Sequence, residues 1–204
     1  NEDSLTLLKE CGISINNGKD QLMAQASNFR LDVLYLRNSD IPQYVRDGVA
    51  DIAIIGDNTE KEKKTGIRHV LDLGFSRCRL SIAVPKNVDF QDISYLQGKK
   101  IATSYPNSLK DFLTENDIEA EIHEISGSVE IAPNIGLADA ICDLVSSGST
   151  LFKNGLKEVY KIFESQAILV ANSGLCGEKQ ELLAQLVFRI KAVLAAKYNK
   201  YILL

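Results

Sequence analysis

A run of small hydroxyl residues follows an apolar, acid-bearing segment in this chain. Residues 138–145 are mostly apolar but carry Asp139 and Asp143, as in a buried strand that delivers acids near its carboxyl end. The residues that follow are Ser146, Ser147, Gly148, Ser149 and Thr150. Residues 151–156 can open a short helix that stops at Gly155. Strand, loop and helix start indicate a phosphate cradle, because free N–H groups, hydroxyl donors and the helix dipole favour an anion there.

This cradle suits a sugar phosphate better than a nucleoside triphosphate. It lacks the lysine and the spacing of a nucleotide P-loop. A carboxylate just upstream, such as Asp143, can accept hydrogen bonds from ribose hydroxyls while the loop holds the 5′-phosphate. An ordinary Ser/Gly turn is the alternative interpretation of the same residues.

Composition excludes several classes of function. The net charge of −4 argues against a generally basic nucleic-acid surface, and no apolar run is long enough to predict a membrane span. The four cysteines are widely spaced, so we expect buried free thiols rather than disulfides or a metal site. The two histidines, His69 and His123, stand alone in strand-like segments, which argues against a zinc enzyme or a histidine-based triad.

Alternating strands and helices must position these residues. Strand candidates lie at 21–26, 29–37, 51–55, 66–75, 79–84, 100–104, 120–125, 138–145, 160–164, 167–170 and 201–204, and helix candidates at 4–11, 41–47, 92–96, 105–115 and 178–197. Residues 51–55 are apolar, which is typical of a parallel strand with both faces covered. Asp57 follows at its carboxyl end, where α/β sheets place ligand loops. The charge run at 60–64 is interpreted as a solvated helix face.

Breaks near Pro85 and residues 171–174 divide the pattern into two α/β lobes. We expect lobe I to comprise residues 1–84 with 171–204, and lobe II to be the inserted segment 85–170. Two crossings between lobes would make a hinge, with the ligand in the cleft between them.

These stretches resemble the catalytic part of the ATP phosphoribosyltransferase family. The matching segments run in order along nearly the whole chain: 40–45 with Gly48 and 50–51, 56–57, 72–75 with 78–80, 101–103 with 105–106, 127–130 with 132–133, and 136–156. The resemblance implies a two-lobed α/β fold like a type II periplasmic binding protein, with the active site in the inter-lobe cleft. It implies transfer of 5-phosphoribosyl from phosphoribosyl pyrophosphate to N1 of ATP, the first step of histidine biosynthesis, with release of pyrophosphate and a need for Mg²⁺.

The resemblance also assigns roles residue by residue. The loop 146–150 would hold the 5′-phosphate and Asp143 the ribose hydroxyls. Glu130 would lie near the ribose and the metal, so that Asp143 and Glu130 are the expected catalytic and Mg²⁺-binding residues. The structural alternative for Glu130 is a helix N-terminal acid favoured by the dipole.

Five further residues are candidates for the nucleotide and phosphate side. Asp57 would face the nucleotide from lobe I, and Tyr105 would line the adenine; the alternatives are a turn aspartate and a packed turn tyrosine. Arg37 is a candidate for a phosphate, as are Arg30 and Arg79, although a surface arginine is the default for any one of them.

The chain departs from the family's pattern at its beginning. The usual first strand and its Lys/Gly-Arg-Leu segment are absent, and the ending at 195–204 resembles the long form, which continues into a histidine-binding domain. We therefore expect a catalytic core of a longer, cytoplasmic homo-oligomer, a dimer or hexamer at full length, with ATP and phosphoribosyl pyrophosphate as its partners. A non-catalytic two-lobed solute-binding module is the alternative, since the fold alone supports both.

Overall fold

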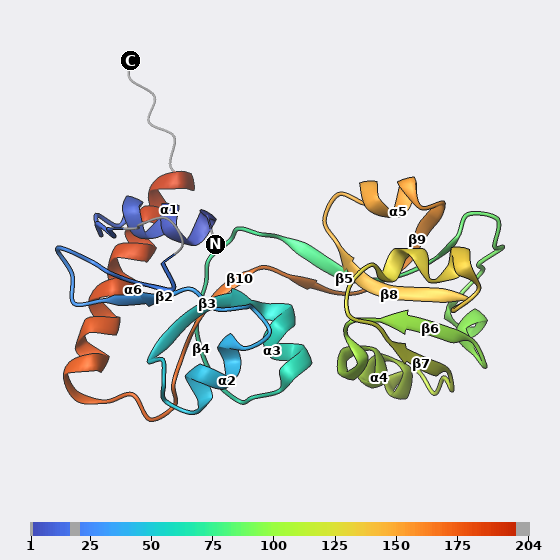
Figure 1. The fold of residues 1–204 in the computed structure, drawn as a ribbon, viewed down its shortest axis with the longest axis horizontal. Coiled ribbons are helices and arrows are strands. Elements are labelled where there is room, and N and C mark those ends of the chain that lie inside the picture. Colours follow the sequence, from blue (N-terminus) through green and yellow to red (C-terminus); the bar gives the residue numbers. More distant parts are fainter. Residues whose placement is uncertain (1, 17–20, 199–204) are drawn as a thin grey trace, which may run out of the picture. The chain divides into compact units, whose positions relative to one another are not determined.

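The computed structural model describes residues 2–16 and 21–198. Contacts divide the chain into two compact units (Figure 1). Unit 1 comprises residues 1–60, 65–76 and 167–204, and unit 2 comprises residues 61–64 and 77–166. The functional division into lobes at 84/85 and 170/171 stays a prediction. The strand expected at 201–204 lies outside the described residues.

Unit 1 is built around a three-stranded sheet of order β3-β10-β4. Its elements are α1 (Glu2–Glu10), β1 (Met23–Gln25), β2 (Asp32–Leu34), α2 (Ile41–Arg46), β3 (Ile52–Gly56), the start of α3 (Asp57–Lys63), β4 (Arg68–Asp72), β10 (Ala167–Ala171) and α6 (Gly177–Tyr198). Every residue of the central strand β10 is buried. Apolar residues of α1 and α6, among them Leu7 and Ile190, pack with Leu169 of β10 in one core cluster.

Local signals predicted these elements well, but they did not predict strand direction. Helix α2 has proline in its first turn, and Asp40 at its N-cap makes no side-chain capping bond. The run at 51–55 forms β3, but the expectation of a parallel neighbour is wrong. In the described sheet β3 pairs with β10, and the two strands are antiparallel. An apolar run reports burial, whereas the direction of the neighbour depends on a strand more than a hundred residues away along the chain.

Unit 2 contains a five-stranded mixed sheet of order β7-β6-β8-β5-β9. Its elements are β5 (Cys78–Pro85), η1 (Ile93–Leu96), β6 (Lys100–Thr103), α4 (Pro106–Glu115), β7 (Glu121–Glu124), η2 (Val129–Ile131), η3 (Pro133–Ile135), β8 (Ala140–Val145), α5 (Ser149–Lys153) and β9 (Leu156–Ser165). Strand β6 is parallel to β7 and β8, and β5 is antiparallel to β8 and β9.

The two faces of this sheet bury different residues. Leu80, Ile82 and Cys142 belong to a cluster that includes Leu109 and Phe112 of α4. Ile141 and Val145 belong to a second cluster with Val129 of η2 and Leu151 of α5. Because successive strand residues project to opposite faces, Asp143 lies on the second face, between Ile141 and Val145. The second face is therefore the one on which β8 presents its carboxylate beneath η2 and α5.

The charge run at 60–64 is not wholly a solvated helix face, and that expectation is wrong for Glu62. Glu62 is a residue of α3, is 7% exposed and packs against the N-terminus of α4. Its carboxylate accepts hydrogen bonds from Asn107 N at 2.9 Å, Ser108 N at 2.9 Å and Ser108 Oγ at 2.8 Å. The first N–H groups of a helix have no partner within the helix, and the dipole there favours an anion. These unsatisfied groups explain why a carboxylate is buried in this run.

Candidate functional site

Asp143 is a half-buried carboxylate on β8, directly across from Ser81 of β5. Its Oδ1 accepts a hydrogen bond from the backbone N–H of Leu144 at 2.7 Å. Burial raises the pKa of Asp143; the bond from Leu144 lowers it, and the negative charge of Glu130 raises it. The structure thus brings the two predicted acids close enough for their charges to interact.

Glu130 is held by a turn whose backbone is unusual. Gly127 has φ +83° and Ser128 has φ +50°, so two consecutive residues are left-handed. That conformation is uncommon for a residue other than glycine and persists where the surroundings enforce it. The next residue, Val129, is 1% exposed and anchors η2 in the core beside β8. The anchored turn fixes the backbone from which half-buried Glu130 projects.

The loop 146–150 follows β8 and is the predicted phosphate cradle. Gly148 has φ +77° and is the N-cap of α5, which begins at Ser149 rather than at residue 151 as expected. The Ser147 hydroxyl donates to Ser149 Oγ at 3.0 Å, and Ser149 N donates to Ser147 Oγ at 3.4 Å. Ser146, Ser147, Ser149 and Thr150 are exposed and Gly148 is half-buried. The loop therefore presents several hydroxyl groups to solvent immediately after Asp143.

The remaining predicted residues belong to other elements. Tyr105 is the N-cap residue of α4 and packs with the cluster on the opposite face of the sheet. Asp57 begins α3 and Arg37 follows β2 as an exposed residue, both in unit 1. Their expected contacts with the nucleotide and phosphates stay predictions.

Arg79, Ser81 and Glu158 form a polar cluster around β5. Arg79 donates to both carboxylate oxygens of Glu158 at 2.5 Å, and Ser81 Oγ donates to Glu158 Oε1 at 2.8 Å. Sequence reasoning missed Glu158, since it lies in a strand with no motif around it. The only available signal was an acid in an otherwise ordinary alternating strand.

The four cysteines are free thiols, as expected, but only Cys11 and Cys142 are buried. Cys78 is half-buried and Cys176 is exposed, so the expected burial is wrong for these two. His69 Nε2 lies 2.8 Å from Asp72 Oδ1, and His123 Nε2 lies 2.7 Å from Glu121 Oε1. Across residues 2–16 and 21–198, no group of three or more His, Cys, Asp or Glu side chains could hold a metal ion. Within the same residues no helix is long and apolar enough to cross a membrane.

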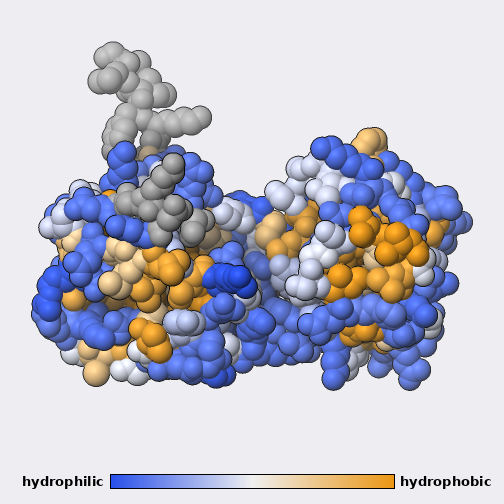
Figure 2. Space-filling view, viewed as in Figure 1, coloured by the Kyte–Doolittle hydropathy of each residue, from blue (hydrophilic) through white to orange (hydrophobic). Residues whose placement is uncertain are grey.

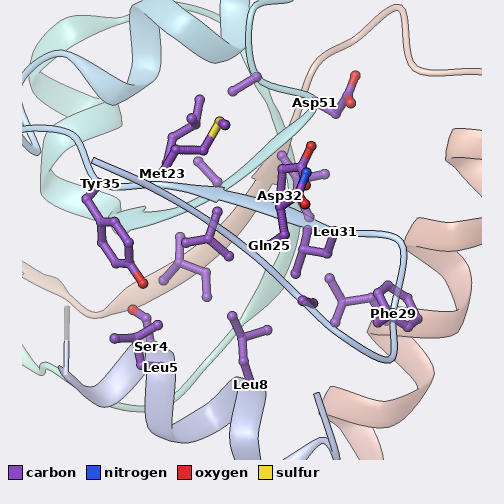
Figure 3. Close-up of a pocket in the computed structure, with 18 of the residues that line it drawn as sticks. Ser4, Leu5, Leu8, Met23, Gln25, Phe29, Leu31, Asp32, Tyr35 and Asp51 are labelled. Atoms are coloured by element: carbon purple, nitrogen blue, oxygen red, sulfur yellow. The ribbon is translucent and has the colours of Figure 1, made fainter. Parts of the chain in front are cut away.

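Unit 1 contains a pocket of about 1010 Å³ that the sequence did not predict. Figure 3 shows Leu8, Leu31 and Met23 around it together with polar groups of Gln25 and Asp32. Apolar side chains also gather on the face of unit 1 in the region of β2 and β3 (Figure 2). Arg30, one of the phosphate candidates, lines this pocket, whereas Asp143, Glu130 and the loop 146–150 belong to unit 2.

The architecture defines the class of protein. It is an α/β protein of two units, and the α/β two-lobed fold class expected from the sequence is confirmed by solved structures. The substrate-binding protein of an amino acid ABC transporter aligns with a TM-score of 0.64 over 96% of this chain and 81% of its own, at 14% identity, a likeness of fold alone.

The family follows from closer matches. The model of the ATP phosphoribosyltransferase family matches residues 37–192. An ATP phosphoribosyltransferase of Cytophaga hutchinsonii is 58% identical over 203 residues, covering 100% of this chain and 71% of the relative. One of Phocaeicola vulgatus is 52% identical over 203 residues, covering 100% of this chain and 72% of the relative.

A solved structure agrees with these relatives. The ATP phosphoribosyl transferase (HisG:HisZ) complex from Thermotoga maritima contains a chain with a TM-score of 0.82 and 27% identity, covering 96% of this chain and 94% of that one. This chain belongs to the ATP phosphoribosyltransferase family, a family of transferases that serve the first step of histidine biosynthesis.

Proposed function

We propose that unit 2 binds phosphoribosyl pyrophosphate and that the chain transfers its 5-phosphoribosyl group to N1 of ATP, with release of pyrophosphate. The observation that carries the proposal is that η2, which bears Glu130, packs against the face of β8 that bears Asp143, with a hydroxyl-rich loop directly after Asp143. A sugar phosphate needs both kinds of group, because its phosphate takes donors and its ribose hydroxyls take acceptors.

The protein has little covalent work to do in this reaction. The substrate brings its own leaving group, and the adenine nitrogen is the nucleophile. The hydroxyls and N–H groups of loop 146–150 hold the 5′-phosphate, and Asp143 accepts hydrogen bonds from the ribose hydroxyls. The carboxylate also places negative charge beside the electron-poor ribose carbon as the bond to pyrophosphate breaks. Alignment and charge complementarity supply the catalysis.

Asp143 and Glu130 are the residues that would hold Mg²⁺. Magnesium is usually bound by one or two carboxylates, retained waters and substrate phosphates rather than by a cage of protein ligands. This donor set fits the pair: burial, and to a lesser extent the charge of Glu130, raises the pKa of Asp143, and a cation would favour its charged form. When bound, the metal neutralises charge on the departing pyrophosphate.

Unit 1 contributes residues that bind the nucleotide and a phosphate. Asp57 contacts the nucleotide, Arg37 contacts a phosphate, and Tyr105 of unit 2 lines the adenine. The protein works in the cytoplasm as a homo-oligomer. The solved relative from Thermotoga maritima is itself described as a complex, which supports an assembly.

Calorimetry with phosphoribosyl pyrophosphate and Mg²⁺, followed by an assay for the ATP adduct, tests this function. We expect the chain to bind phosphoribosyl pyrophosphate and to form the adduct. No heat with this ligand, alongside tight binding of an amino acid, would favour the solute-binding alternative.

A further inference from the structure

Arg79 donates three hydrogen bonds to other groups of unit 2. Its Nε and Nη2 both contact the Glu158 carboxylate at 2.5 Å, which is the two-pronged geometry of a guanidinium–carboxylate pair. Its Nη1 donates to the backbone carbonyl of Ser146 at 3.1 Å. Ser146 is the first residue of the loop 146–150, so Arg79 joins this loop to β9.

The side chains involved share one face of the sheet. Arg79 and Ser81 are two residues apart on β5, and they lie opposite Val145 and Asp143 of β8, respectively. Ser81 donates to Glu158, as Arg79 does. Glu158 therefore contacts Ser81, the residue opposite Asp143, and also contacts Arg79, which holds the start of the loop.

The Arg79–Glu158 pair is more than an exposed ion pair. Its side chains are 32% and 25% exposed, and exposed pairs contribute little to stability. The pKa of Glu158 is lowered and that of Arg79 is raised, in each case chiefly by the hydrogen bond between them. A planar guanidinium held at two points has its Nη1 aimed in a fixed direction, toward Ser146 O.

We propose that Arg79 and Glu158 are positioning residues for the phosphate loop. Glu158 orients the guanidinium, and the guanidinium fixes the carbonyl of Ser146 where the chain leaves β8. The loop donors are thereby held in a constant position relative to Asp143. This inference rests on the proposed function for its consequence in substrate binding. It replaces the expectation that Arg79 contacts a substrate phosphate.

The variant E158Q separates the two roles by the sign of its effect. If Glu158 orients Arg79, the variant frees the loop and weakens binding of phosphoribosyl pyrophosphate, by about tenfold in Kd. If Arg79 contacts a phosphate directly, removal of the competing carboxylate leaves binding unchanged or tightens it. E124Q, an exposed variant on β7 at the opposite edge of the same sheet, makes the same change of charge; it is the matched control and should bind as the unmodified protein does.

A second variant, R79K, and a second measurement, hydrogen exchange, test the positioning role without measuring turnover. R79K retains the charge but loses the two-pronged geometry, so we expect it to weaken binding about as much as E158Q. Hydrogen exchange of the amides at 146–150, measured without ligand, should be faster in E158Q than in E124Q. Equal exchange in these variants, or tighter binding in E158Q, would overturn the positioning role. Failure of the unmodified protein to bind phosphoribosyl pyrophosphate would instead defeat the proposed function and leave the exchange result to decide.

Discussion

Ser81 of β5 and Asp143 of β8 are direct cross-strand partners in unit 2. Ser81 is 1% exposed and donates its hydroxyl to Glu158, while Asp143 remains half-buried next to the charge of Glu130. The sheet thus separates two acidic groups on one face. Glu158 is paired with Arg79, whereas burial and the charge of Glu130 both raise the pKa of Asp143. A half-buried carboxylate beside a second acid is suited to a substrate hydroxyl or a cation.

The variant Asp143→Asn should lower turnover without lowering stability. The raised pKa of Asp143 means that folding disfavours its charged form, so a neutral amide of the same shape should leave the free energy of unfolding unchanged or increase it. Turnover should fall at least about tenfold, which is ~1.4 kcal/mol of transition-state stabilisation. Thermal unfolding and steady-state kinetics check the two halves. Unchanged turnover with intact binding would contradict the assignment.

The variants Ser147→Ala and Thr150→Ala should weaken binding of phosphoribosyl pyrophosphate. Each removes an exposed hydroxyl that can donate to the 5′-phosphate, worth roughly 1.5–3 kcal/mol for a hydrogen bond to a charged group. ATP binding, measured separately by calorimetry, should barely change. Thr114→Ala is the control, because its hydroxyl bonds Lys110 O within α4. Equal loss for both substrates would count against the cradle.

The variant Glu62→Ala should destabilise unit 2. It removes the acceptor of two backbone N–H groups and one hydroxyl at the start of α4. Loss of a helix cap costs about 0.5–2 kcal/mol, and we expect the upper end because the site is buried. Urea unfolding followed by circular dichroism measures the change. Lys63→Ala, at an exposed position of α3, the helix that carries Glu62, should have little effect. A similar loss of stability in both variants would mean that the substitutions disturb α3 rather than the capping of α4.

The Arg79–Glu158 pair should make stability depend on pH in the acid range. The pKa of Glu158 is lowered from 4.5, first by the hydrogen bond from Arg79 and further by Ser81 and Lys161. A lowered pKa in the folded state contributes stability above pH 4.5, and this contribution is lost as the pH falls through the folded-state pKa. Urea unfolding of the unmodified protein and E158Q at pH 7 and at about pH 3 should show a difference that shrinks with acid. A difference that is constant across this range would refute the linkage.

The amino-acid sequence by itself determined most elements and the order of the candidate site. Turn residues are local signals: Gly12 and Gly148 adopt positive φ where the sequence predicted a helix end and a loop. Hydrophobic period and the proline of α2 likewise act over a few residues. The succession of Asp143, the loop and a short helix was therefore predictable, although α5 begins at Ser149 and not at residue 151.

Only the tertiary structure decided which residues support that site. Glu62 reaches Ser108 across 46 positions of sequence and Arg79 reaches Glu158 across 79. The antiparallel partner of β3 likewise comes from the far end of the chain. A charged residue in a helix or strand has the same local pattern whether it faces water or a buried donor. Its role is set by the donors that the fold brings to it, because burial of a charge is favourable only where partners compensate for lost hydration.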